Sequence, residues 1–515
     1  MAKQKSIAQN TIMLYIRTFI VMIVGLYTSR VILKALGETD YGVYNVVGGI
    51  VGMLGFLNAS LSGATSRFLT NAIGQGNQEY TNQVFSASLN LHILLSIFIV
   101  IIGETAGVWL LYNKLVIPPN QMSTAFWLLQ FSIITSIFVI TAIPYNASLI
   151  SHENMSVYAY MGLYDAFAKL AIALIIDYID SERLIFYGFL LMINSIISII
   201  IYRIYAIRHY PECRLRLIRN KTLYKKLSSY SIWDMTGNIA AICQGQGINI
   251  LLNMFFGPIA NTARAISFQV LSGVTSFLGG FTTASRPRII KYYAQGNYDE
   301  MYRLTFITAK ISFLLIFILA LPILFEIRYI LHLWLGNDVP TLTYSFTTII
   351  IITALFDSFH TAYLMAFHAI GRIKTGNQIC GTFKIMALPI SYLALKLGAP
   401  AISVFVIILI ISVICHCISW KIVYGYHKFS VKELLSTVYI PCLLVAITSI
   451  ILPGILSSIM PDNTRRFVVI LLVSWSTVAL LAYFIGFTKR ERSQVINPML
   501  TNILEKLHIY KFSNT

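Results

Sequence analysis

Long apolar stretches recur along almost the whole 515-residue chain and limit what it can fold into more than any other feature. A helix that crosses a membrane needs about 20 consecutive, mostly apolar residues, and these stretches are of that length. Hydrophobic residues make up 57% of the chain and charged residues only 11%, whereas soluble proteins average about 25% charged residues. The sequence therefore excludes a soluble globular protein and predicts an all-α integral membrane protein.

About fourteen membrane-spanning helices account for the apolar stretches. We expect them near residues 10–33, 42–66, 84–112, 123–150, 156–177, 184–207, 229–256, 259–285, 304–335, 341–370, 376–398, 400–424, 436–460 and 467–488. No segment outside them is long enough to form a soluble catalytic domain. We expect no enzymatic activity.

The net charge of +18 comes from 38 Lys and Arg residues against 20 Asp and Glu. Most of these cations fall in alternate loops, beginning with the N-terminal segment, and the segment between the two halves is especially basic. Because positively charged loops stay on the cytoplasmic side, both termini are expected in the cytoplasm. The basic residues are scattered between apolar runs, so nucleic acid is not an expected partner.

A short motif appears twice, once in each half of the chain. The segment ATSRFLTNAIGQGN at 64–77 returns as ASRPRIIKYYAQGN at 284–297, each time after the second helix of a half. This repeat predicts two six-helix lobes and two additional helices. The expected divisions are lobes at 1–207 and 229–424, a basic linker at 208–228, extra helices at 425–488 and a basic tail at 489–515.

Several cations lie inside the predicted spans, where a charge at the bilayer centre costs about 2.5–3.5 kcal/mol on insertion scales. Such residues are tolerated around a water-filled cavity or an anionic ligand. We therefore assign six of them to a cationic lumen that binds substrate: Arg17, Arg30, Lys169, Arg264, Lys310 and Lys384. Lys169 follows Asp165 by four residues, so a local ion pair is an open alternative for it.

Two further groups of polar residues lie within the spans. One face of the helix at 229–256 carries Asp234, Asn238, Gln246, Asn249 and Asn253, a pattern typical of cavity lining or of another polar helix surface. We favour cavity lining. Asp357 with His360 one turn later, and Asp165, are candidates for coupling transport to an ion gradient, and an interhelical hydrogen bond is the alternative for the first pair.

No metal, nucleotide or other cofactor is expected. Cys415, His416 and Cys417 are adjacent in a helical run, where neighbouring positions point to different faces. There is no G-x(4)-G-K-[S/T] loop that would bind ATP. An H⁺ or Na⁺ gradient is the energy source that we expect instead.

The end of the first helix carries Ser29 and Arg30, then LKALGETDYGVYNVV at 33–47, SGATSRFLT at 62–70 and GQGN at 74–77. Together with twelve helices in two halves plus two more, these residues resemble the multidrug/oligosaccharidyl-lipid/polysaccharide exporter superfamily, and within it the Wzx-type O-antigen and polysaccharide flippases. The likeness in layout covers nearly the whole chain, and the second half matches more loosely.

This resemblance implies a multi-pass protein of the bacterial plasma membrane. Its substrate would be an undecaprenyl-pyrophosphate-linked oligosaccharide, moved from the cytoplasmic to the periplasmic leaflet by alternating access. In the family, arginines of the first helix and of the first helices of the second half serve the lumen, and Arg17, Arg30 and Arg264 match those positions. Membrane lipids, a polysaccharide polymerase and glycosyltransferases would be its partners.

Three other functions remain open. A peptidoglycan lipid flippase shares the helix plan and a basic lumen. A cation-coupled multidrug exporter has the same fold, but cationic drugs favour an acidic cavity. A membrane-embedded glycan polymerase or ligase is disfavoured, because every predicted outer loop is short, as at 113–122.

Overall fold

The structure is a computed structural model of the chain. It describes residues 7–152, 154–216, 218, 220–370, 373–426 and 428–493. Side chains are described from residue 17 onward, except at 56–60, 63–64, 155, 158, 229–238, 277, 279–280, 283–284, 287, 368 and 373–377.

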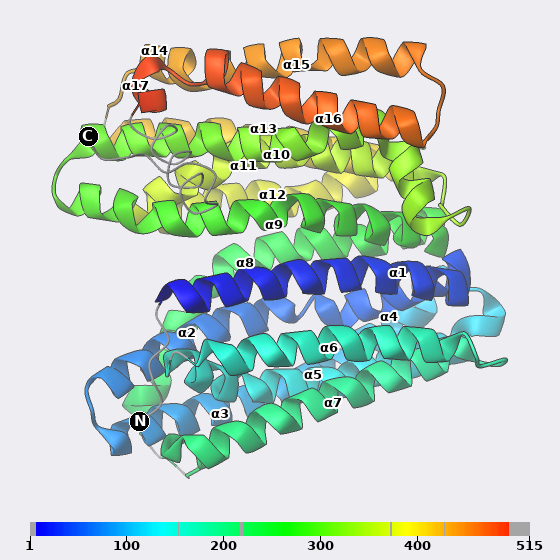
Figure 1. Cartoon of the computed structure of the whole chain (residues 1–515). Coiled ribbons are helices and arrows are strands. Elements are labelled where there is room, and N and C mark those ends of the chain that lie inside the picture. The colour runs from blue at the N-terminus through cyan, green and yellow to red at the C-terminus, as the bar shows by residue number, and fades with distance from the viewer. Residues whose placement is uncertain are drawn as a thin grey trace. The chain divides into compact units, whose positions relative to one another are not determined.

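Helices make up nearly all of the described chain, which confirms the all-α fold (Figure 1). In chain order they are α1 (Ile7–Gly52), α2 (Gly55–Gly74), α3 (Gln78–Ile102), α4 (Val108–Asn113), α5 (Met122–Ser151), α6 (Met155–Ile176), α7 (Arg183–His209), α8 (Lys221–Phe256), α9 (Pro258–Ala294), α10 (Tyr298–Leu335), α11 (Leu342–Ile370), α12 (Ile373–Lys396), α13 (Ser403–Tyr426), α14 (Val431–Leu434), α15 (Ile440–Ile459), α16 (Thr464–Leu481) and α17 (Lys489–Glu491). Short π-helical turns continue three of them, at Gly103–Gly107, Leu435–Tyr439 and Ala482–Gly486, and single 3₁₀ turns lie at Pro119–Gln121 and Pro211–Cys213.

Within the described residues, twelve helices are long and apolar enough to cross a membrane. The expected number of about fourteen is roughly consistent with this, because α1 contains parts of two predicted spans and α9, which covers the predicted span at 259–285, is a helix that is not among the twelve. The helical backbone of α1 breaks at Gly37, where φ is 78° and ψ is 172°. Residues other than glycine rarely adopt this backbone conformation. The predicted helix at 10–33 is the arm before the break, and the one at 42–66 begins after it and continues into α2.

The backbone supports the internal repeat. The repeated segments both end in Gln-Gly-Asn, at 75–77 and 295–297, which we call the QGN motif. Each copy forms the same turn, in which Gly76 and Gly296 have φ of 70° and 72°. Asn77 and Asn297 then accept a hydrogen bond from the backbone N–H three residues later, which caps the next helix. The break at Gly37 also has a counterpart at the equivalent position of the second copy, since Gly257 separates α8 from α9 with φ of 73° and ψ of −174°.

The chain packs into two compact units, which we call the first and second units. The first unit consists of residues 1–269, 334–343 and 381–407, and the second of residues 270–333, 344–380 and 408–515. These units are defined by which residues pack together, whereas the predicted lobes at 1–207 and 229–424 are defined by the sequence repeat. The lobes therefore stay a prediction.

Each unit has its own apolar core. In the first unit, α1 packs along α6, and α5 packs against α7, so these four helices run side by side (Figure 1). Val46, Leu129 and Leu184 belong to one of its buried clusters. In the second unit, Phe313, Phe317 and Phe359 stack within a larger buried cluster.

Candidate functional site

Among the predicted lumen residues, Arg264 contacts the backbone of α8 and an aromatic ring of its own helix. It lies in α9 about 9 Å along the helix from Pro258, by the helical rise per residue. One guanidinium nitrogen, Nη2, donates to the carbonyl oxygen of Gly245 at 2.8 Å, and the guanidinium carbon lies 4.4 Å from the centroid of the Phe268 ring. Nε is buried and has no hydrogen-bond partner among the described residues. The partners of Arg264 among the described residues are thus neutral.

Two asparagines of α8, Asn249 and Asn253, make hydrogen bonds to neighbouring segments. Asn249 and Asn253 are 1% and 0% exposed, and both bond to Asn261 of α9. Asn249 also donates to the carbonyl of Asn45 in α1, and Asn253 accepts from the backbone N–H of Val116 at 2.8 Å. These side chains join helices within the first unit, so the alternative of a polar helix surface describes them.

Gln246 lies in the same interface, because a methyl group added to Gly49 of α1 would come within 2.8 Å of its Oε1. The other two members of the predicted set, Asp234 and Asn238, have side chains outside the described part of the structure.

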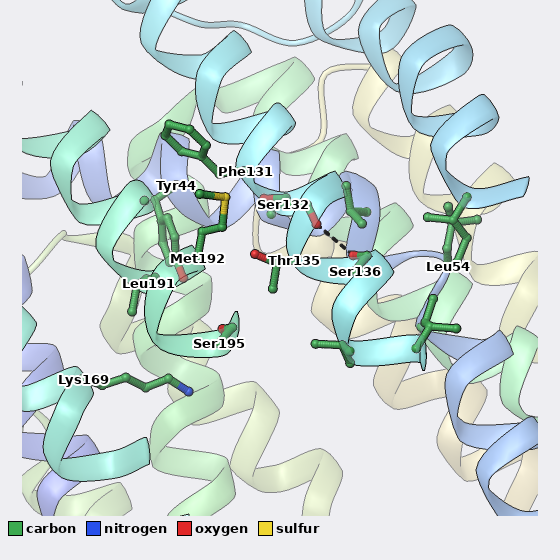
Figure 2. A pocket seen from close by; sticks show the side chains of 18 residues that line it. Tyr44, Leu54, Phe131, Ser132, Thr135, Ser136, Lys169, Leu191, Met192 and Ser195 are labelled. Carbon is green, nitrogen blue, oxygen red and sulfur yellow. Dashed lines mark hydrogen bonds between the residues drawn. The ribbon is translucent and has the colours of Figure 1, made fainter. Parts of the chain in front are cut away.

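A cavity of about 330 Å³ opens in the first unit between α1, α3, α5, α6 and α7 (Figure 2). We call it the first-unit cavity. Its lining is Tyr44, Gly48, Val51, Gly52, Leu54, Gly55, Ile99, Phe131, Ser132, Thr135, Ser136, Val139, Ile140, Lys169, Gly188, Leu191, Met192 and Ser195. Four hydroxyl side chains of α5 and α7 are among these residues. Ser132, Thr135 and Ser136 have the i, i+3, i+4 spacing that puts them on one face of α5, a signal in the sequence that we did not use.

Lys169 is the charged residue of that lining, and the structure gives it an acidic partner. Its Nζ lies 2.7 Å from Oδ2 of Asp165, one turn earlier on α6. The other carboxylate oxygen, Oδ1, accepts from Nδ2 of Asn194 at 2.9 Å. The local ion pair that the spacing allowed is therefore present, and it neutralises Lys169.

Lys310 is also paired, although the sequence offered it no nearby acid. It lies in α10 and is fully buried, with Nζ 2.7 Å from Oε2 of Glu491, 181 residues away. Glu491 in turn accepts from the N–H and hydroxyl of Thr488. Spacing along one helix could not reveal this pair. Lys310 is thus held in a buried ion pair within the second unit, and its predicted role in the lumen stays a prediction.

The three remaining cations of the predicted set belong to the first unit. Arg17 lies against α6, since a methyl group added to Gly162 would come within 2.2 Å of its Nε. Lys384 is half-buried on α12, and no ion pair joins it to an acid of the described residues. Arg30 is exposed on α1. Whether these three face substrate stays a prediction.

Two of the three candidate coupling residues, Asp357 and His360, lie in a polar layer between α11 and α13. Asp357 accepts a hydrogen bond from Ser412, and Nδ1 of His360 lies 3.2 Å from the hydroxyl of Ser419. The interhelical hydrogen bonds that we considered are therefore present, and they leave a coupling role untested.

We did not predict that His416 belongs to this layer. It is 6% exposed, with Nε2 2.6 Å from the Tyr439 hydroxyl. Ser412, His416 and Ser419 are spaced at i, i+4 and i+7 in α13, and this helical spacing could have identified the layer from the sequence.

Near the start of the predicted basic linker, Glu212 forms hydrogen bonds with residues of the first unit. Nε2 of His152 lies 2.6 Å from Oε1 of Glu212, and Gln78 donates to Oε2 at 3.3 Å. Burial by itself would raise the pKa of Glu212. The bonds from His152, from its own backbone N–H and from Gln78 outweigh burial and lower that pKa below its ordinary value of 4.5.

Comparisons with known proteins agree with this architecture. A MatE family model matches residues 238–393. An inward-facing multidrug resistance MATE family transporter of the MOP superfamily superposes with a TM-score of 0.70 at 13% identity, covering 82% of this chain and 99% of that one. The lipid II flippase MurJ in an inward closed conformation gives a TM-score of 0.68 at 14% identity, covering 92% of this chain and 98% of that one.

A MOP superfamily transporter from Pyrococcus furiosus gives a TM-score of 0.58 at 13% identity, covering 82% of this chain and 96% of that one. No curated protein sequence matches the chain. At these identities the likeness shows the fold: this is a multi-pass membrane protein with the fold of MOP-superfamily transporters.

Proposed function

We propose that the protein is a flippase that moves an undecaprenyl-pyrophosphate-linked oligosaccharide from the cytoplasmic to the periplasmic leaflet of the bacterial plasma membrane. The transporter fold supports a translocating role. A lipid-linked oligosaccharide joins an anionic pyrophosphate to a polar glycan. Its passage therefore needs a charged polar path inside the protein while the lipid tail stays in the bilayer.

The observation that carries this proposal is the environment of Arg264. An embedded guanidinium that bonds only to neutral groups keeps its full charge for a ligand. Its planar fork can make paired, charge-assisted hydrogen bonds to phosphate oxygens. Arg17 and Lys384 belong to the same unit and are further candidates for the pyrophosphate. Lys169 and Lys310 contribute less, because each faces a carboxylate.

The transport cycle would be alternating access driven by an H⁺ or Na⁺ gradient, with both termini in the cytoplasm. The layer that contains Asp357 and His360 offers titratable groups for such coupling. Glycosyltransferases would supply the substrate and a polymerase would consume it.

The test is a reconstitution in liposomes with a fluorescent undecaprenyl-pyrophosphate-linked oligosaccharide, scored by its accessibility to an external quencher. Arg264→Ala should slow flipping at least tenfold, because one lost charge-assisted hydrogen bond is worth about 1.5–3 kcal/mol. Arg264→Lys should be intermediate, since it keeps the charge and loses the fork.

Arg328→Ala is the matched control, because that arginine lies in α10 beside Tyr344, 5.9 Å from its ring centroid, in the second unit. It should flip at the wild-type rate. Full activity of Arg264→Ala would contradict the anion site, and no flipping by the wild-type protein would contradict the function itself.

A second candidate is the flipping of lipid II, the peptidoglycan precursor. Its specific support is the likeness to MurJ, which covers 92% of this chain against 82% for the MATE transporter. The same liposomes loaded with labelled lipid II decide between the two substrates. Faster movement of lipid II than of the pyrophosphate-linked oligosaccharide would favour the second candidate.

A further inference from the structure

The first-unit cavity differs from the surroundings of Arg264 in charge. Lys169, the charged side chain in its lining, is already paired with Asp165, and Asn194 holds the carboxylate from the other side. An anion would have to compete with that carboxylate for the lysine. The cavity therefore suits an uncharged ligand.

Its polar groups are hydroxyls, and they are available to a ligand. Thr135 on α5 and Ser195 on α7 make no hydrogen bond to any described residue, and Figure 2 shows them on facing helices with Lys169 nearby. Ser132 and Ser136 donate to carbonyls of their own helix and keep lone pairs for a donor. Hydroxyls that both donate and accept complement the hydroxyls of a sugar ring.

The remaining walls suit the apolar faces of such a ring. Tyr44 and Phe131 contribute aromatic side chains, and Gly48 and Gly52 leave the wall of α1 without side chains. A volume of about 330 Å³ is at the lower end of the range of ligand pockets, which suits part of a glycan rather than a whole lipid-linked oligosaccharide.

From this geometry we infer that the first-unit cavity binds a sugar residue of the substrate, separately from the pyrophosphate site at Arg264. The inference rests on the proposed function and adds that two sites bind different parts of the substrate. Neutral hydroxyls of the cavity select the glycan, and the guanidinium of Arg264, with its neutral partners, binds the phosphate. The cavity would then decide which oligosaccharides are transported, and Arg264 would act on any undecaprenyl pyrophosphate.

The test compares binding of two ligands to the purified full-length protein: undecaprenyl pyrophosphate with its oligosaccharide and undecaprenyl pyrophosphate without it. Gly48→Leu fills the cavity, because Gly48 is part of its lining. The new side chain can be accommodated there, since a Cβ at Gly48 meets no atom within 4 Å. It should weaken binding of the glycosylated lipid at least tenfold and leave the bare lipid unchanged. Gly25→Leu is the matched control, since Gly25 lies on the same helix, outside the cavity lining and with the same free space.

A second variant keeps the volume and removes hydroxyls: Thr135→Val combined with Ser195→Ala. It should weaken binding of the glycosylated lipid about tenfold, which is toward the lower end of the effect of losing two modest hydrogen bonds, and again leave binding of the bare lipid unchanged. Arg264→Ala should weaken the binding of both ligands. Equal loss for both ligands in the cavity variants, or no loss for either, overturns the glycan site while the flippase proposal stands. Failure of the wild-type protein to bind either lipid overturns the flippase proposal instead.

Discussion

At the scale of single residues, the partner of a charge decides its role, and the partner can be close or distant along the chain. Lys169 pairs with Asp165 at the i, i+4 spacing visible in the sequence. Lys310 pairs with Glu491, which no local pattern connects to it. Arg264 has neutral partners from α8 and from its own helix. Of these three cations, Arg264 is the one whose described partners are neutral.

Glu212 gives a pH-dependent prediction at this scale. Because its folded-state pKa is below 4.5, the carboxylate stabilises the fold above that pH, and this stability is lost as the pH falls through the lower folded-state pKa. Glu212→Gln should therefore lower the melting temperature at pH 7, by the equivalent of about 1–3 kcal/mol. Thermal unfolding in detergent should show the difference shrinking below pH 4.5.

Glu300→Gln is the control, because Glu300 is 41% exposed and pairs with Arg303 on its own helix. Exposed pairs of that kind contribute little to stability, so this variant should melt like the wild-type protein. A melting difference for Glu212→Gln that stays constant from pH 7 to pH 3 would argue against the assigned role of its carboxylate.

At the scale of elements, close backbone contact determines how α1 packs against the helices on either side of Gly257. A methyl group at Gly42 would lie 2.0 Å from the carbonyl oxygen of Pro258, and one at Gly49 would overlap the amides of Asn249 and Gln246. Glycine is required at Gly42, where the contact is with backbone, whereas a side chain at Gly49 would have to displace the amides of Asn249 and Gln246. Gln246 and Asn249 of α8 then lie against α1, and Asn249 and Asn253 bond to other segments of the first unit.

Gly42→Ala should destabilise the first unit by about 1–3 kcal/mol, because the clash is with backbone and cannot be relieved by a side-chain rotation. The melting temperature in detergent measures this loss. Gly48→Ala, six residues later in the same helix and with free space around it, should melt at or slightly above the wild-type temperature. Similar melting of the two variants would show that the contact at Pro258 is not tight.

At the scale of the whole molecule, the embedded cations differ between the two units. Five of the six predicted lumen cations belong to the first unit, and the sixth, Lys310, is bound to Glu491 in the second. The second unit also pairs its buried Glu326 with Arg466 at 2.8 Å. These two ion pairs join α10 to the segments around α16 and α17, while Arg264, with its neutral surroundings, lies in the first unit.

Lys310→Met should destabilise the protein by about 3–5 kcal/mol, because it leaves the Glu491 carboxylate buried without its partner. Replacing both residues, with Lys310→Met and Glu491→Gln together, should recover most of the loss, since no unpaired charge remains. Melting temperatures of the two variants in detergent check this order. A double variant that melts no higher than the single one would mean that the pair does not stabilise the second unit.

The sequence by itself determined the membrane-embedded all-α fold, the approximate helix number and the internal repeat. These follow from apolar length, local turn chemistry and spacing, which are properties of neighbouring residues. The QGN turns and the i, i+4 pair at Asp165 and Lys169 belong to the same class, and both are present.

Only the tertiary structure decided which polar groups are satisfied and which remain available. It joined Lys310 to a residue 181 positions away, used Asn249 and Asn253 to hold helices together, and left Arg264 among neutral groups. It also placed hydroxyls of α5 and α7 around one cavity. The physical reason is that the cost of burying a polar group depends on partners brought together in space, and helical spacing says nothing of a neighbouring helix.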